Sequence, residues 1–216
     1  MKKNYEITEK QLDFLEGYLL RKYPSITDET RIELSDHLIS DFEATTENGN
    51  LSQYLSNELG FIRKFVFAAA NRHQKKYGKE TWRQFFSFFT ETKLLPITFL
   101  NLILFYFLAE NLNNKWLWGS FVIAVSIIFL ISILFGMINK KKLRKLEEVK
   151  YLGSDIWLGY LMIQLPDFFG FEDILMSNSF LFTIYASFTT IYSLAAYIII
   201  REKRKIILEK YKHLLN

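Results

Sequence analysis

The spacing of apolar residues divides this chain into a first part that predicts short amphipathic helices and a second part that predicts membrane spans. In the first part, apolar residues recur at three- and four-residue steps, which is the period of a helix. No run alternates between apolar and polar residues as a half-buried strand would. Helices are expected at about residues 9–22, 28–47, 51–58 and 61–77. We therefore predict an all-α fold in which residues 1–80 form a small helical domain.

Local signals mark the ends of these predicted helices. Thr8 and Gln11 match a capping box, in which the two side chains satisfy free backbone donors at a helix start. Pro24 ends the first helix, because its ring disfavours a helical conformation at the preceding residue. Gly49 is the expected stop of the second helix, since glycine adopts the left-handed conformation at little cost.

Residues 81–93 connect the predicted domain to the apolar part of the chain and carry an aromatic stripe. Four aromatic residues follow one another at helical spacing: Trp82, Phe85, Phe86 and Phe89. A helix with such a stripe suits the headgroup region of a bilayer. The same stripe suits packing against neighbouring helices equally well, and the sequence leaves both interpretations open.

Four apolar stretches predict a four-helix transmembrane domain over residues 94–200. Spans are expected at about residues 94–112, 116–138, 153–171 and 179–200. The second is the clearest, because its 23 uncharged residues would reach roughly 35 Å as a helix, and a hydrocarbon core is about 30 Å thick. The third is the weakest, because it is short and contains Gln164, Pro166 and Asp167.

Basic residues indicate how these spans are oriented. They gather before the first span, between the second and third, and after the fourth, whereas the two other turns hold only Lys115. Four spans place every basic cluster on the cytosolic side, as the positive-inside rule requires. The residues expected to anchor this topology are Lys140, Lys141, Lys142, Arg144, Lys145, Arg201, Lys203, Arg204 and Lys205. We expect a multi-pass protein of a bacterial inner membrane with both termini in the cytosol and a basic amphipathic tail at residues 201–216.

Composition narrows the classes of partner and chemistry. In a soluble protein the net charge of +4 would suggest a nucleic-acid partner. Here the bases flank apolar stretches, so the lipid bilayer explains them better and no direct nucleic-acid partner is expected. The chain has no cysteine, which excludes disulfides, thiolate metal sites and cysteine nucleophiles.

Three residues of the second predicted helix are weak candidates for a metal site. Glu33, His37 and Asp41 share one helix face, and carboxylate and imidazole groups one turn apart can converge on a metal ion. His37 also adjoins the apolar stripe, where a histidine is usually a boundary residue bonded to a neighbour. The second interpretation is preferred, so neither a metal nor another cofactor is expected.

Small residues at helix-face spacing predict close packing between spans. They are Ser132 and Gly136 in the second span, and Ala186, Thr190 and Ser193 in the fourth. In lipid such residues let helices approach closely, so that packing and hydrogen bonds replace the hydrophobic drive. We expect packing within the chain first and a homo-oligomer second.

Few polar groups in the predicted spans point to chemistry. No Lys, Arg, Glu or His lies near the middle of a span, which argues against an ion-coupled pump. The chain also lacks a phosphate-binding glycine loop and the common hydrolase motifs, so no enzyme activity is expected. A small transporter or lipid-handling protein that uses an outer face around Pro166, Asp167 and Glu172 is the alternative function.

Residues 8–75 resemble a known helical domain. The resemblance rests on an acidic helix, a glycine turn and a Leu-Gly pair: Glu33-Leu34-Ser35-Asp36-His37-Leu38, Asp41-Phe42-Glu43, Asn48-Gly49 and Glu58-Leu59-Gly60. This pattern is similar to the HAAS domain, which also occurs in the DUF1700 group of bacterial membrane proteins, although Phe61-Ile62-Arg63-Lys64 departs from the usual continuation. The resemblance carries no catalytic residue.

The resemblance implies a cytosolic helical module joined to several spans, often encoded beside a PadR-like transcription regulator and acting in signalling or envelope regulation. Together with the predicted spans, it leads us to expect an inner-membrane protein of regulatory or scaffold type. Residues 1–80 are expected to bind its protein partner.

Overall fold

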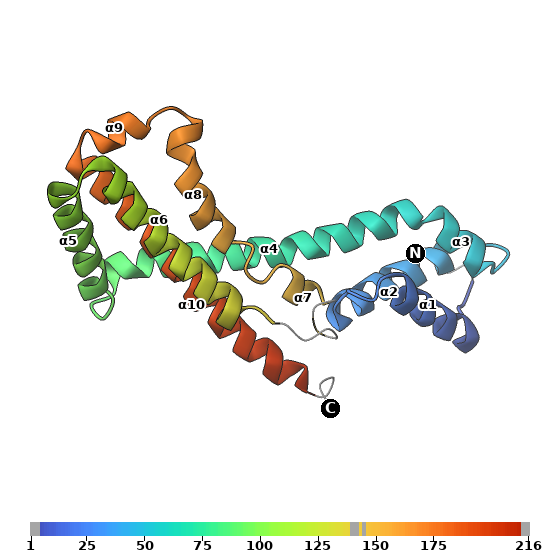
Figure 1. The fold of residues 1–216 in the computed structure, drawn as a ribbon. Helices are drawn as coiled ribbons and strands as arrows, with labels where there is room; N and C mark the ends of the chain where they lie inside the picture. Colours follow the sequence, from blue (N-terminus) through green and yellow to red (C-terminus); the bar gives the residue numbers. More distant parts are fainter. Residues whose placement is uncertain (1–4, 139–142, 144–145, 213–216) are drawn as a thin grey trace. The chain divides into compact units, whose positions relative to one another are not determined.

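The computed structural model describes residues 5–138, 143 and 146–212 (Figure 1). Over these ranges all secondary structure is helical, which confirms the all-α prediction. The elements are α1 (Glu9–Lys22), α2 (Asp28–Thr45), α3 (Leu51–Asn57), α4 (Leu59–Thr90), α5 (Leu95–Asn111), α6 (Asn114–Ile131), the π-helix η1 (Ser132–Gly136), α7 (Glu147–Lys150), α8 (Ile156–Phe168), α9 (Glu172–Met176) and α10 (Ser179–Lys210).

These elements group into two compact units, and the boundary between them falls within α4. The first unit comprises Met1–His73 and Lys140–Tyr151, and the second comprises Gln74–Asn139 and Leu152–Asn216.

The first unit has its own hydrophobic core. Its buried members come from four helices: Leu15 and Leu19 of α1, Leu34, Leu38 and Phe42 of α2, Leu51 and Leu55 of α3, and Ile62 of α4. The predicted capping box is present, with the Thr8 N–H donating to Gln11 Oε1 over 2.9 Å. The chain before α1 is held to α2, because the Ile7 N–H donates to a carboxylate oxygen of the buried Glu43 over 3.2 Å.

Gly49 shapes the turn between α2 and α3. Its φ of 65° lies in the left-handed region, as the sequence predicted. A Cβ atom at this position would lie 2.7 Å from the Tyr5 ring, which packs over the turn. The Gln11 amide also donates to the Gly49 carbonyl over 2.8 Å. The turn therefore depends on glycine both for its backbone conformation and for the space that Tyr5 occupies.

The helix predicted at residues 61–77 is longer than expected, and its predicted end is wrong. α4 continues through the connecting segment to Thr90. No proline interrupts the chain between Pro24 and Pro96, and buried side chains such as Tyr77 and Phe85 continue the helical period. Gly78 directly follows the predicted end, but it lies within α4, and the helix continues through it so that the juxtamembrane segment becomes its last turns.

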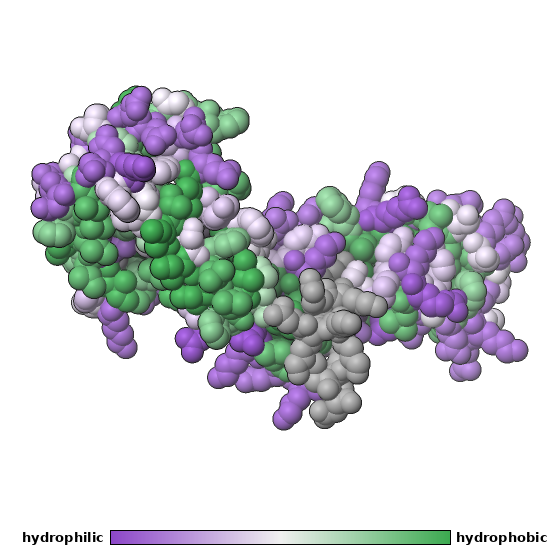
Figure 2. All heavy atoms as spheres, in the orientation of Figure 1, coloured by the Kyte–Doolittle hydropathy of each residue, from purple (hydrophilic) through white to green (hydrophobic). Residues whose placement is uncertain are grey.

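Among the described residues, two helices are long and apolar enough to cross a membrane. They are α6 continued by η1 (Asn114–Gly136) and α10 (Ser179–Lys210), and a third crossing results if α4 and α5 are counted together as one bent span. Figure 2 shows a hydrophobic surface over α5 and α6, where Phe99, Leu100 and Ile103 are more than half exposed. By length and composition, the described residues thus indicate a membrane protein.

The third predicted span, residues 153–171, yields a shorter helix than expected. α8 has 13 residues and reaches about 20 Å, against a hydrocarbon core of about 30 Å. Pro166 lies in its last turn, and Gly170 follows with a φ of 69°. Proline and a left-handed glycine together end the helix before the apolar stretch ends.

α10 is the interior helix of the second unit, and it extends past its predicted end. Two thirds of its most apolar window is buried (67%), compared with 22% for α6. The helix was predicted to stop at residue 200, but it runs on to Lys210. No glycine or proline occurs from Ser179 onward, and the basic residues after Ile200 are good helix formers, so the span and the tail form one helix.

Replacing Gly49 by alanine is expected to destabilise the first unit by about 1–2 kcal/mol, the cost of a left-handed alanine, with an added clash against Tyr5. Gly17→Ala is the matched control: a Cβ at Gly17 meets nothing within 4 Å, and alanine favours the α1 helix by about 1 kcal/mol. Hydrogen exchange of α1–α3 amides in the full chain measures both. Equal effects of the two substitutions would contradict this account of the turn.

Candidate functional site

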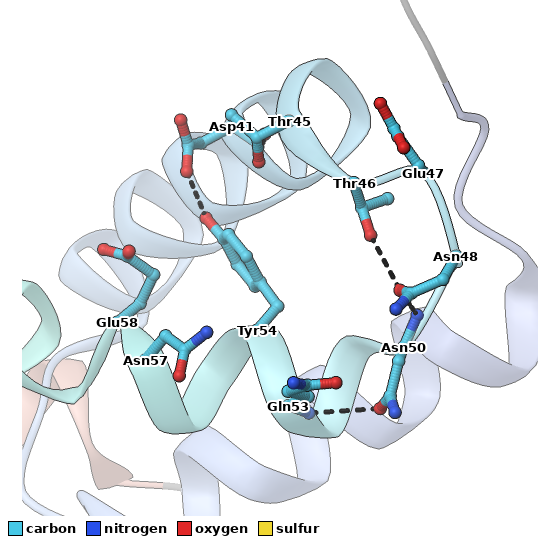
Figure 3. Close-up of a pocket in the computed structure, with 10 residues that line it drawn as sticks. All are labelled: Asp41, Thr45, Thr46, Glu47, Asn48, Asn50, Gln53, Tyr54, Asn57 and Glu58. Carbon is cyan, nitrogen blue, oxygen red and sulfur yellow. Dashed lines mark hydrogen bonds between the residues drawn. The ribbon is translucent and has the colours of Figure 1, made fainter.

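The first unit carries an open polar pocket between the C-terminal end of α2 and α3 (Figure 3). Its volume is about 680 Å³. The loop that joins the two helices forms one side, and the described lining residues are Asp41, Thr45, Thr46, Glu47, Asn48, Asn50, Gln53, Tyr54, Asn57 and Glu58. Apart from Tyr54, every one of these side chains is acidic, an amide or a threonine.

Local hydrogen bonds order the loop that forms one side of this pocket. Asn48 Oδ1 accepts from the Asn50 N–H over 3.0 Å and from the Thr46 hydroxyl over 3.3 Å. Asn50 Oδ1 in turn caps α3 by accepting from the Gln53 N–H over 3.1 Å. Short polar side chains that bond the backbone nearby are favoured in turns and at helix starts. The turn chemistry therefore places the Asn48, Asn50 and Gln53 side chains around one concave surface.

A hydrogen bond from α3 to α2 spans the floor of the pocket. The Tyr54 hydroxyl donates to Asp41 Oδ2 over 2.7 Å, and the Tyr54 ring packs edge-on against Phe42 with ring centres 5.2 Å apart. Burial raises the pKa of the Tyr54 phenol above its ordinary value of 10, and the hydrogen bond and negative charge of Asp41 raise it further. Tyr54 thus remains a neutral donor at physiological pH.

The lining determines which groups the pocket favours. Asp41, Glu47 and Glu58 are negative, and no Lys or Arg is among the described lining residues. Carboxylates and amide oxygens accept hydrogen bonds, and they accept most strongly from cationic donors. The pocket therefore suits a lysine or arginine side chain, flanked by backbone N–H groups, better than it suits an anion.

The predicted metal trio does not come together. Glu33 pairs with Arg72 over 3.2 Å, the His37 ring contacts the Phe65 ring with centres 5.7 Å apart, and Asp41 accepts from Tyr54. In the part of the chain that the structure describes, no group of three His, Cys, Asp or Glu side chains could hold a metal ion. Of the three, only Asp41 lines the pocket.

The structure describes one of the two basic clusters that were predicted to anchor the topology. Lys140, Lys141, Lys142, Arg144 and Lys145 lie outside the described residues. At the other cluster, Lys203 Nζ lies 2.6 Å from Glu80 Oε2 of α4, and Arg204 Nη1 donates to the Phe135 carbonyl over 2.6 Å. Arg201 and Lys205 are exposed.

The predicted packing residues are buried in the second unit. Ser132, Ala186, Thr190 and Ser193 are each at most 5% exposed. A Cβ atom on Gly136 would lie 2.6 Å from Ile200 Cγ2. The sequence singled out one side of these contacts but missed the partner of Ser193, which is Gly159 of α8. In the sequence, Gly159 is marked only as an isolated glycine within a predicted span, and this does not identify the residue it contacts.

The aromatic residues of α4 differ in whether they pack against a neighbouring helix or remain exposed. Phe85 is 2% exposed and packs with Ile191, Tyr192 and Ala195 of α10. Phe86 is 58% exposed. Packing against a neighbouring helix therefore accounts for Phe85, whereas Phe86 keeps the exposure that a headgroup-facing aromatic needs.

The residues of the alternative function lie at the end of α8 and at the start of α9. Asp167 is exposed near the end of α8, and Glu172 begins the short helix α9. Pro166 is buried, and its carbonyl accepts from the Phe171 N–H over 2.9 Å. In the described chain, Asp167 is a solvent-facing carboxylate at a helix end.

Comparison of the chain with protein families, with curated proteins and with solved structures found no match in any of the three. The candidate site therefore rests on its own geometry.

Tyr54→Phe is expected to lower the free energy of unfolding of the first unit by about 1 kcal/mol at pH 7, because the donor to Asp41 is lost. Because the folded-state pKa of Tyr54 is raised, this contribution is complete below about pH 10 and is lost as the pH rises through the folded-state pKa. Hydrogen exchange of α2 and α3 amides at pH 7 provides the measurement.

The Asp41→Ala variant completes a double-mutant cycle for this hydrogen bond. In the Asp41→Ala background, Tyr54→Phe should change the stability by only a few tenths of a kcal/mol. An undiminished effect in that background would show that the Tyr54 hydroxyl contributes to stability independently of Asp41, and it would contradict the assigned hydrogen bond.

Proposed function

We propose that this is a membrane-anchored protein of regulatory or scaffold type whose N-terminal helical unit binds a protein partner. The observation that carries the proposal is the polar pocket of about 680 Å³ on a unit that has its own core. A module with its own core and an open hydrogen-bonding surface is equipped for recognition, while the apolar helices hold the same chain at a bilayer.

The chemistry of the pocket defines the partner segment. Three carboxylates without a described basic neighbour in the lining attract a basic segment, and such electrostatic attraction weakens as salt is added. The resemblance of residues 8–75 to the HAAS domain supports a cytosolic partner in signalling or envelope regulation, with the PadR-like regulator system as one candidate source. A homo-oligomer of the apolar helices is compatible with this role.

The proposed topology has four spans and places both termini in the cytosol of a bacterial inner membrane. Support comes from α6 and α10, which are long and apolar enough to cross a membrane. It also comes from the basic clusters that follow both helices in sequence. α5 has 17 residues and exposes Phe99, Leu100 and Phe107, and α8 exposes Trp157 and Leu161. Short helices cross a bilayer when it thins locally around them, at a modest cost.

A photo-crosslinking residue at Asn57, an exposed position of the pocket, is expected to capture a discrete partner in intact cells. The same residue at Glu16, exposed on α1, is the positional control. The double variant Glu47→Gln, Glu58→Gln should reduce the Asn57 crosslink at least fivefold, because it removes two of the three charges in the lining. The matched pair Asp13→Asn, Glu16→Gln removes two exposed charges elsewhere and should leave the crosslink unchanged. Equal capture from Asn57 and Glu16 would overturn the proposal.

Single cysteines on this cysteine-free chain test the topology. Asn113→Cys and Ser177→Cys should react with a membrane-impermeant thiol reagent from outside the cell, whereas Lys212→Cys should react only after permeabilisation. All three positions are exposed, so local burial does not prevent labelling. Reaction of Lys212→Cys in intact cells would rule out the four-span arrangement.

A further inference from the structure

The C-terminal part of α10 carries a second pocket, which the proposed partner-binding role does not use. Its volume is about 560 Å³, and its described lining includes Tyr197, Ile198, Arg201, Arg204 and Lys205. These residues recur at steps of one, three and four along α10, so they belong to one face of the helix. The pocket combines an aromatic and an aliphatic side chain with three cations.

The residues of this face lie on both sides of the point where α10 changes from apolar to charged. Every residue from Ser179 to Ile200 is uncharged, and the charges begin at Arg201. From Ile198 to Lys205 the helix rises about 10 Å, which is enough to cross one headgroup layer of about 5–8 Å. Tyr197 and Ile198 therefore lie at the end of the apolar stretch, and the three cations lie in the next two turns.

The charges of the pocket favour an anion. Glu202 also lines it, so the lining has three positive groups and one negative group. Arg204 is oriented by its hydrogen bond to the Phe135 carbonyl, while its Nε atom is buried and has no hydrogen-bond partner among the described residues. The guanidinium charge of Arg204 is delocalised over all its nitrogens, and a phosphate oxygen is an acceptor that arginine prefers.

The neighbouring pocket on α10 shows that this preference is local. That pocket has a volume of about 220 Å³ and lies between α4 and α10. Its charged lining residues are Glu80, Glu91, Glu202, Arg83 and Lys203. It therefore has more acids than bases, and Lys203 is already paired with Glu80. Of these two pockets, the one with Arg201, Arg204 and Lys205 has the excess of cations beside an apolar wall in its described lining.

We propose that this pocket binds one anionic phospholipid. The headgroup phosphate lies among Arg201, Arg204 and Lys205, and the upper acyl chain lies along Tyr197 and Ile198. Both halves of the pocket are used by such an amphiphile, whereas a free anion would use only the cations. The inference rests on the second unit alone, so its test does not depend on whether the first unit binds a partner.

Native mass spectrometry of the full chain, released from nanodiscs of mixed phosphatidylglycerol and phosphatidylcholine, tests the proposal. One phosphatidylglycerol should remain bound per chain. The double variant Arg201→Gln, Lys205→Gln should lower its occupancy about tenfold or more, given the attraction that each basic residue contributes near an anionic lipid. Glu202→Gln should raise the occupancy, because it removes the one negative group in the described lining.

The control variant Lys210→Gln, Lys212→Gln removes the same number of charges from residues beyond the described lining and should change the occupancy less than threefold. An equal loss in this control would show attraction by the tail in general and overturn the proposal. Equal retention of phosphatidylcholine, or displacement of the lipid by millimolar inorganic phosphate, would also overturn it. Circular dichroism checks that each variant is folded, and a gain of lipid in Glu202→Gln is informative even where the double variant does not fold.

Discussion

Close packing around α10 is the constraint on which the second unit depends. Between helices surrounded by lipid, the hydrophobic effect supplies little attraction, so contacts must come from shape. Gly136 leaves room for Ile200, and Gly159 leaves room for Ser193. Any side chain at either glycine would have to displace α10 or the neighbouring element. Two thirds of the most apolar window of α10 is buried as a result, at 67%.

Polar groups enter this apolar interior because α10 satisfies many of them itself. The hydroxyls of Thr183, Thr189 and Ser193 each donate to the carbonyl four residues earlier, over 2.7 to 2.9 Å. Such bonds remove the cost of burying a hydroxyl and keep the side chain compact. At the basic end, Arg204 instead donates to the Phe135 carbonyl in the last turn of the π-helix, where backbone carbonyls have no partner within the helix. The same helix thus packs tightly along its apolar length and presents cations where that length ends.

The first unit is organised by a different constraint, the left-handed turn at Gly49. The turn directs α3 back along α2, and Tyr5 and Gln11 lie against it. The concave polar surface between the two helices is a direct consequence. The polar pocket of the first unit and the tight packing of the second therefore rest on separate physical causes, turn geometry and close contact between apolar helices.

Local sequence information was sufficient for the helices whose ends carry a strong signal. The capping box at Thr8 predicted the start of α1, and the glycine at residue 49 predicted the left-handed turn. The ends of α4 and α10 lie beyond the predicted ones. Gly78 does not end α4, no glycine or proline follows Ser179 in α10, and buried side chains continue past both predicted ends. The pocket cannot be found from the sequence pattern, because nothing local relates Asp41 to its hydrogen-bond partner Tyr54, 13 residues further on. By itself the sequence determined the helical class, the apolar stretches and the strongest caps, because these depend on neighbours within one or two turns. Which side chains face one another across α2 and α3, or across α8 and α10, was decided only by the tertiary structure, because those contacts join residues that the local period does not relate.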